Sequence, residues 1–102
     1  MNPSKPLSSF FCSIQRALLG NVTPNLRAVY LFVEEEMYGL IFYYDQPLSE
    51  EEEDLASLTD TEFISDFPDY QTSCNIEVIP YPKPIPKKGF CVYERYEKNP
   101  DG

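Results

Sequence analysis

The sequence predicts an α+β fold in which a four-stranded, mainly antiparallel sheet packs against two helices, in the order αββαββ. Two segments with apolar residues at helical spacing and four segments rich in β-branched or aromatic residues lead to this prediction. The chain has 102 residues, which is enough for one domain core but not for two. We therefore expect a single domain over residues 1–102, with a frayed tail at about 97–102.

The first predicted helix covers residues 8–19. Phe11, Ile14 and Leu18 recur at helical spacing, and Gly20 follows as a stop signal. The N-terminus of this helix can be capped by either of two serines, Ser8 or Ser9. Its apolar stripe is expected to face the core.

Two strands are predicted next, Leu26–Glu34 and Met37–Tyr44, because both segments are rich in Val, Ile, Leu, Tyr and Phe. The three glutamates where they meet predict a hairpin with an acidic tip. Apolar residues occur on both faces, so either both faces are covered or one carries an exposed aromatic patch. The tyrosines available for such a patch are Tyr30, Tyr38, Tyr43 and Tyr44.

A second helix is predicted to begin after Ser49, which can cap the N-terminus while Glu52, three residues on, completes a capping box. Pro68 closes this helix, since a proline disfavours helical geometry in the residue before it. The stripe expected to be buried consists of Ala56, Thr59, Phe63 and Phe67.

A third strand is predicted at residues 72–79, where alternation places Cys74, Ile76 and Val78 on one half-buried side. Prolines then occupy every second position from 80 to 86, which gives a stiff, extended segment with few backbone donors. We expect this segment to connect two strands along an edge of the fold. The last strand is predicted at residues 89–96.

Opposite charges are segregated along the chain. The formal net charge is −9, and the stretch from 28 to 82 holds 14 of the 17 acids but not one Lys or Arg. The helix dipole explains part of the acidic cluster at residues 50–54. The remainder indicates a surface for a cationic protein partner. Nucleic acid is excluded as a direct ligand of that surface, because phosphate contacts require Lys and Arg.

The candidate partner-binding residues are acids of the hairpin tip, acids in and around the second helix, and two tyrosines that could anchor the centre of an interface. They are Glu34, Glu35, Glu36, Asp45, Glu50, Glu51, Glu53, Asp54, Glu62, Asp66, Asp69, Tyr43 and Tyr44.

Catalytic, metal-binding and cofactor-binding roles are not expected. The chain has no histidine, the commonest general base and neutral metal ligand. Phosphate-binding glycine patterns are missing, and residues 50–54 lack the alternation of a calcium loop. Cys12, Cys74 and Cys91 form no close pair, which favours reduced cysteines. Neither a secretion signal nor a membrane span is recognisable, so we expect a cytoplasmic protein without a membrane partner.

Four segments carry a resemblance to a known group: FYYD at 42–45, SEEE at 49–52, TEFISDF at 61–67 and VYER at 92–95. In this order and spacing the chain resembles small bacterial immunity proteins encoded beside polymorphic toxins, including those of contact-dependent growth inhibition. The resemblance covers residues 26–97. It implies a cytosolic inhibitor of a cognate toxin, often a nuclease.

Such an inhibitor would act by steric and electrostatic occlusion, because a nuclease presents cations to phosphate and an acidic protein can cover the same surface. Two other classes remain open. One is an acidic mimic of nucleic acid, and the other is an acidic adaptor or structural subunit that binds another basic protein.

Overall fold

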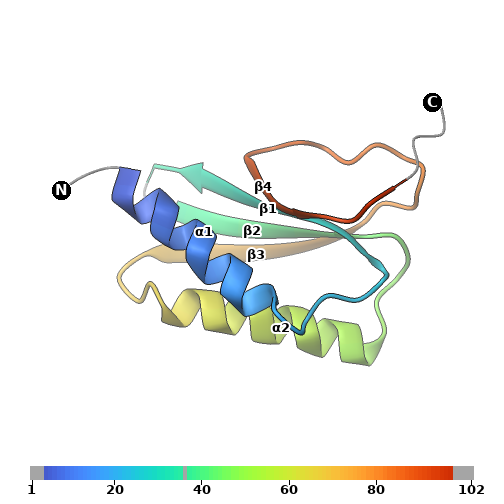
Figure 1. The fold of residues 1–102 in the computed structure, drawn as a ribbon, viewed down its shortest axis with the longest axis horizontal. Helices are drawn as coiled ribbons and strands as arrows, with labels where there is room; N and C mark the ends of the chain where they lie inside the picture. Colours follow the sequence, from blue (N-terminus) through green and yellow to red (C-terminus); the bar gives the residue numbers. More distant parts are fainter. Residues whose placement is uncertain (1–3, 36, 98–102) are drawn as a thin grey trace.

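The computed structural model describes residues 4–35 and 37–97, which form two helices and one sheet. The helices are α1 (Ser4–Leu18) and α2 (Glu50–Ser65), and the strands are β1 (Leu26–Glu34), β2 (Met37–Tyr44), β3 (Gln71–Val78) and β4 (Phe90–Glu94). Both helices pack against one face of the sheet, whose strand order is β3-β2-β1-β4 (Figure 1). The predicted α+β class and the order αββαββ are confirmed.

The sheet is mixed, so the prediction of a mainly antiparallel sheet was wrong. β1 is antiparallel to β2 and to β4, whereas β2 and β3 are parallel. The cause is α2, whose 16 residues connect β2 to β3. A helix of that length spans about 24 Å and returns the chain to the end of the sheet where β2 begins. β3 therefore runs in the same direction as β2.

α1 begins at Ser4, not at residue 8, so Ser8 and Ser9 lie inside the helix and do not cap it. Pro6 does not prevent this earlier start, because the first turn of a helix has N–H groups without intrahelical acceptors and tolerates proline. The helix ends at Leu18, one residue before the predicted end, and Gly20 follows it with a positive φ of 79°, as its prediction as a stop signal requires.

The main core lies between the helices and the sheet. Phe10 is fully buried at its centre, and its ring packs against four aromatic rings, those of Tyr38, Phe63, Phe67 and Tyr70. The two predicted helix stripes face this core: Ile14, Leu18, Ala56, Thr59 and Phe63 are buried, and Phe11 and Phe67 are partly buried. Apolar periodicity thus identified the inner side of both helices.

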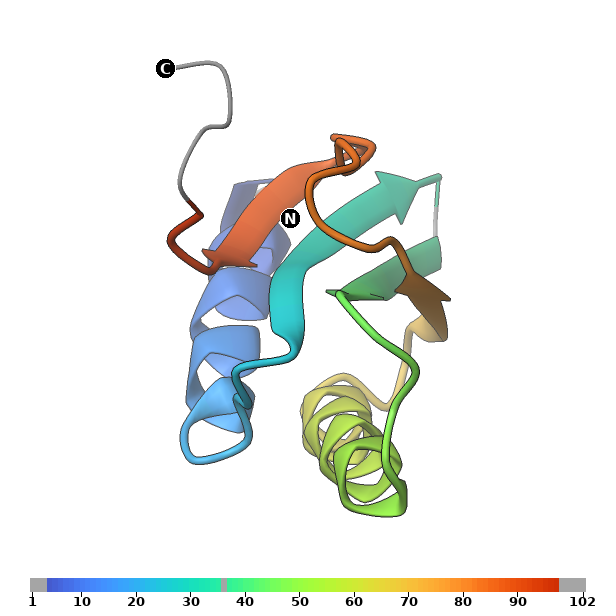
Figure 2. The same cartoon turned by 90° about the vertical axis from the view of Figure 1, so that its right-hand side faces the viewer.

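A second, smaller cluster lies on the other face of the sheet. Its buried members are Ala28, Tyr30, Ile41 and Tyr43, and Ile79 and Ile85 pack against them. The proline-rich segment between β3 and β4 crosses this face (Figure 2), so the prediction that it follows an edge was wrong. It has to cross because β3 and β4 lie at opposite ends of the strand order. Both faces of the hairpin strands are therefore covered, so the first of the two sequence alternatives holds and the exposed aromatic patch does not.

A buried arginine holds the crossing segment and the residues just after β4 against the sheet. Arg27 is only 3% exposed. Its guanidinium donates two hydrogen bonds to the Glu97 carboxylate, at 2.6 and 2.8 Å. It also donates to the carbonyl oxygens of Ile79, at 2.7 Å, and Lys83, at 2.8 Å. One side chain of β1 thus joins three separate parts of the chain.

Gly89, just before β4, has a φ of 92°, and a Cβ added there would lie 2.4 Å from the carbonyl oxygen of Leu31. We expect Gly89→Ala to lower the free energy of unfolding by at least about 2 kcal/mol. Two costs contribute to this loss: the strain of a positive φ in alanine, and the clash of its Cβ with the Leu31 carbonyl. Gly20→Ala is the control, because φ is also positive there but nothing lies within 4 Å. Urea denaturation compares the two, and equal losses would contradict a role for the Leu31 contact.

Candidate partner-binding surface

The N-terminus of α2 is built by the predicted capping box. The Ser49 hydroxyl accepts a hydrogen bond from the Glu52 N–H at 3.1 Å, and the Glu52 carboxylate accepts one from the Ser49 N–H at 3.0 Å. Glu52 also accepts hydrogen bonds from Thr23, at 2.7 Å, and Asn25, at 3.2 Å. These bonds, the one from Ser49 N–H first, lower the pKa of Glu52. Glu52 is therefore engaged within the fold.

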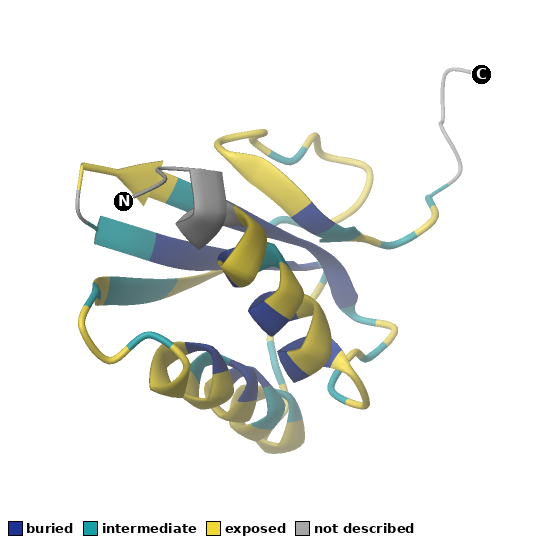
Figure 3. Ribbon diagram, turned by 60° about the vertical axis from the view of Figure 1, so that its left-hand side comes forward, coloured by how far each residue is buried: buried dark blue, intermediate teal, exposed yellow. Residues whose placement is uncertain are grey.

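The other acids at this end of α2 are exposed. They are Glu50, Glu51, Glu53 and Asp54, and none of them forms a salt bridge within residues 4–35 and 37–97. The helix dipole stabilises each by about 0.3–1 kcal/mol. α2 itself contains no Lys or Arg that could offset their mutual repulsion. The outward side of α2 is exposed along its whole length (Figure 3).

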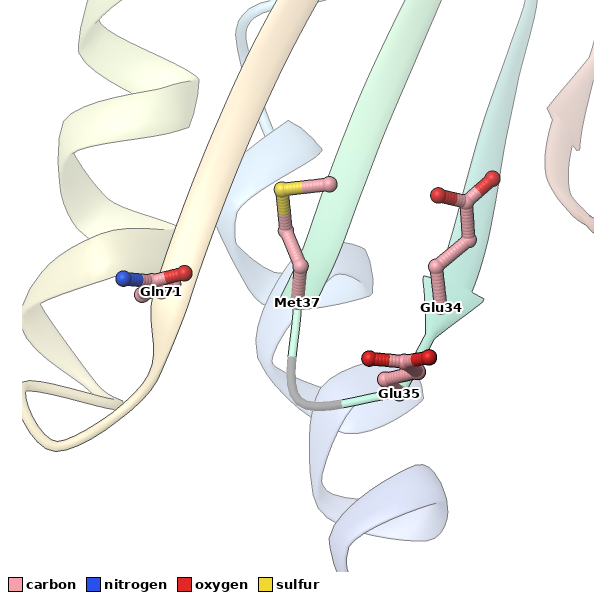
Figure 4. Close-up of a pocket in the computed structure, with 4 residues that line it drawn as sticks. All are labelled: Glu34, Glu35, Met37 and Gln71. Carbon is pink, nitrogen blue, oxygen red and sulfur yellow. The ribbon is translucent and has the colours of Figure 1, made fainter.

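The tip of the β1–β2 hairpin carries a second acidic group. Glu34 and Glu35 are exposed, and Glu36 lies outside the described residues. The register places Glu34 opposite Met37, and Met37 beside Gln71 on β3. These residues line an open hollow at the end of the sheet (Figure 4). Two carboxylates beside an apolar side chain suit a lysine or arginine, whose stem can pack on apolar surface.

Glu35 has a positive φ of 50°, a conformation that favours glycine. We expect Glu35→Gly to raise the free energy of unfolding by about 0.5–1 kcal/mol, because a left-handed conformation costs about 1–2 kcal/mol in a residue with a Cβ. Glu34→Gly is the matched control and should lower stability, since Glu34 lies in β1. Chemical denaturation of both variants tests this, and a loss of stability in Glu35→Gly would contradict it.

The acids near the end of α2 differ in their surroundings. Glu62, Asp66 and Asp69 are all exposed. Asp66 accepts a hydrogen bond of 2.6 Å from the hydroxyl of Ser13, which is buried in α1. Asp66 therefore helps to join the two helices, whereas Glu62 and Asp69 form no salt bridge in the described part of the chain.

Asp45 already has a cationic partner. Its carboxylate accepts hydrogen bonds from the Arg95 guanidinium and from the Tyr81 N–H, both at 2.9 Å. The bond from Tyr81 N–H, followed by that from Arg95, lowers the pKa of Asp45. The structure thus gives Asp45 an internal role at the start of the crossing segment.

Tyr43 and Tyr44 are only 1% and 3% exposed. Tyr43 belongs to the cluster beneath the crossing segment, and Tyr44 belongs to the main core. Burial raises the pKa of Tyr44 to about 12. The structure therefore places both tyrosines in the interior, not at the surface where a role as interface anchors would require them.

The exposed acids gather at two opposite ends of the sheet. α2 runs back along the sheet from the end where β2 finishes, so its first turn lies far from the hairpin tip (Figure 1). The hairpin tip lies instead beside the start of β3, where Met37 pairs with Gln71. The side of the molecule formed by α2 and β3 connects these two acidic ends.

Sequence reasoning missed two acids on that connecting side. Glu77 is exposed on β3 and lies between Ile76 and Val78, so alternation places it on the opposite side of the strand from them. Asp60 lies on α2 close enough to Cys74 of β3 to raise the pKa of that thiol, after burial as the main cause. Its Oδ1 atom is buried and accepts no hydrogen bond within the described residues. No local sequence signal marks such an atom.

Among the residues that the structure describes, no three His, Cys, Asp or Glu side chains gather into a group that could hold a metal ion. No helix in the same part of the chain is long and apolar enough to cross a membrane.

The protein has an α+β fold, with two helices on one face of a mixed sheet. Its surface is acidic, and the exposed acids of α2 and of the hairpin tip lack ionic partners in the described part. The chain belongs to the MafI2 immunity protein family, whose model matches residues 8–97. The match confirms the resemblance to immunity proteins and extends it from residues 26–97 to most of α1. No curated protein matches the chain.

Proposed function

We propose that this chain protects the cell that makes it by binding and neutralising a cognate toxin, a nuclease with a cationic surface. The observation that carries this proposal is the match to an immunity protein family over residues 8–97. The proposed mechanism is binding without catalysis in the cytoplasm: the acidic protein covers the toxin surface that would otherwise contact nucleic acid phosphates.

The distribution of charge supports a cationic partner. The three ion pairs of the described residues involve only Arg27, Arg95, Asp45 and Glu97. The exposed acids of α2 and of the hairpin tip therefore keep their charge uncompensated, and like charge at this density costs folding stability. Lysine or arginine side chains from a toxin would remove that repulsion on binding.

The backbone at the hairpin tip gives a second reason. Glu35 occupies a left-handed conformation that glycine or asparagine would adopt with less strain. Short hairpin turns require a positive φ, and residues other than glycine that hold one are over-represented at functional sites. The carboxylate of Glu35, beside that of Glu34, is therefore a proposed contact for the toxin.

The test starts with the genes beside this one, where a large secreted protein with a cationic C-terminal domain is expected, and then measures binding of the full chain to that toxin domain. Raising the salt concentration from about 0.05 to about 0.5 M is expected to lower the association rate at least about tenfold, because salt screens long-range attraction. Stopped-flow fluorescence measures this rate, and a rate independent of salt would contradict electrostatic steering.

Neutralisation is measured separately, as cleavage of DNA and RNA by that toxin domain. An equimolar amount of the chain should abolish cleavage, whereas the same amount added after cleavage is complete should change nothing. A complex that forms while cleavage continues would rule out occlusion of the nucleic-acid surface.

A further inference from the structure

The two edges of the sheet differ in their protection against pairing with another chain. β4 is short, at five residues, its pairing with β1 contains a register shift, and α1 lies against it, with Gln15 donating to the Val92 carbonyl. β3 has eight residues in unbroken register with β2 and contains no Pro, Lys or Arg. Natural sheets protect their edges with short strands, irregular pairing, prolines and lysines. β3 has none of these features.

The backbone of β3 has donors directed away from the sheet. Just after the strand, the Ile79 N–H donates to the Tyr44 carbonyl of β2 at 2.8 Å. N–H groups alternate in direction along an extended strand, so those of Val78, Ile76 and Cys74 point to the free edge. In the described part of the chain no strand lies beyond β3. These donors are available to a further strand.

Apolar side chains beside this edge are incompletely covered. Ile76 and Val78 share the helix-facing side of the sheet with Phe42 and Tyr44, their partners in register. They are nevertheless 44% and 41% exposed, although the sequence predicts a half-buried strand. A strand added at this edge would cover the side chains that α2 leaves exposed.

The charged residues of α2 and β3 themselves are all acids, because neither element contains Lys or Arg. Glu77 is exposed on β3, and Asp60 of α2 has a buried Oδ1 atom without a hydrogen-bond donor in the described residues. Burial raises the pKa of Asp60, because removal from water disfavours the charged form of its carboxyl group. A second copy of this chain would bring further acids to these positions, with a formal net charge of −9 on each copy. The charge therefore favours a cationic segment.

We propose that the β3 edge binds an extended segment of the toxin, which pairs with β3 as a fifth strand and places lysine or arginine side chains near Asp60 and Glu77. This proposal rests on the proposed function and specifies the surface that performs it. Backbone hydrogen bonds would provide affinity, and the side chains flanking the edge would provide specificity.

Amide hydrogen exchange of the full chain, free and bound to its cognate toxin domain, tests the pairing directly. The N–H groups of Cys74, Ile76 and Val78 should exchange rapidly in the free chain and at least about tenfold more slowly in the complex. A complex in which these three amides are not slowed would overturn edge pairing and leave the proposed function intact. Absence of any complex would instead contradict the proposed function.

Two substitutions at one position separate the backbone from the side chain. Ile76→Pro removes a free-edge N–H without removing a hydrogen bond to β2, whereas Ile76→Thr keeps that N–H and the β-branched shape. The dissociation constant should rise at least about tenfold more in Ile76→Pro than in Ile76→Thr. Circular dichroism establishes that both variants fold. Equal affinity of two folded variants would overturn the proposal.

Sedimentation of the chain alone tests the other possible occupant of the β3 edge, which is a second copy of the chain. A monomer at about 0.1 mM is expected, because two uncompensated acidic surfaces repel each other. A dimer in which the same three amides are slowed would show that a second copy occupies the edge, which overturns the assignment to a toxin segment.

Discussion

Replacing Arg27 by methionine is expected to lower the free energy of unfolding by about 3–5 kcal/mol, the cost of breaking a buried ion pair by removing one partner. The Glu97 carboxylate would lose both of its hydrogen bonds to Arg27, and two backbone carbonyls, of Ile79 and Lys83, would lose theirs. Methionine keeps the apolar part of the side chain, so the lost free energy of unfolding comes from removing the guanidinium group. Guanidinium chloride denaturation followed by circular dichroism measures it.

Arg16→Met is the matched control for this change. Arg16 is exposed on α1 and takes part in none of the three salt bridges of the described residues. Surface substitutions of this kind alter stability by about 0.5 kcal/mol or less. If the Arg27 and Arg16 variants lost the same stability, the bonds of Arg27 to Glu97 and to the crossing segment would have no net effect on folding.

The parts of the fold that were predictable from the sequence depend on local signals. The bounds of β1 and β2 match the prediction, and the capping box of Ser49 and Glu52 correctly marks the start of α2. Caps and apolar periodicity act over a few residues, so they can be recognised without knowledge of the tertiary structure. The start of α1 was placed too late because a serine within a helix gives the same local signal as a serine cap.

The features of the fold that were not predicted depend on contacts between residues far apart in the sequence. Whether β3 runs parallel or antiparallel to β2 depends on where α2 delivers the chain, and 70 residues separate Arg27 from Glu97. The same limit applies to the candidate site. Alternation showed that apolar residues occupy both faces of β2, but only the crossing segment shows that Tyr43 is covered. Most acids of α2 lie off the buried stripe of Ala56, Thr59 and Phe63, so their exposure could be predicted, whereas the buried Oδ1 atom of Asp60 could not.

The largest effect on binding is expected from reversing charge at the start of α2. Glu50, Glu51, Glu53 and Asp54 are exposed, whereas Glu52 holds the cap and must be kept. Changing these four acids to lysine should lower the association rate with the toxin domain by about 10–10³-fold, since electrostatic steering contributes that much. Changing Glu50, Glu51 and Glu53 to glutamine and Asp54 to asparagine should give an intermediate loss, because neutral side chains remove attraction without adding repulsion. Stopped-flow association at low salt measures both.

A pair of single substitutions shows whether position or net charge causes the effect. Glu53→Lys and Glu94→Lys change the formal charge equally, but Glu53 lies on α2 and Glu94 lies on the opposite face of the sheet, in register with Ala28. Both residues are exposed, so both variants should remain folded. If α2 faces the toxin, Glu53→Lys slows association more than Glu94→Lys. Equal slowing would mean that the whole charge of the protein steers the toxin and that α2 is not the contact surface.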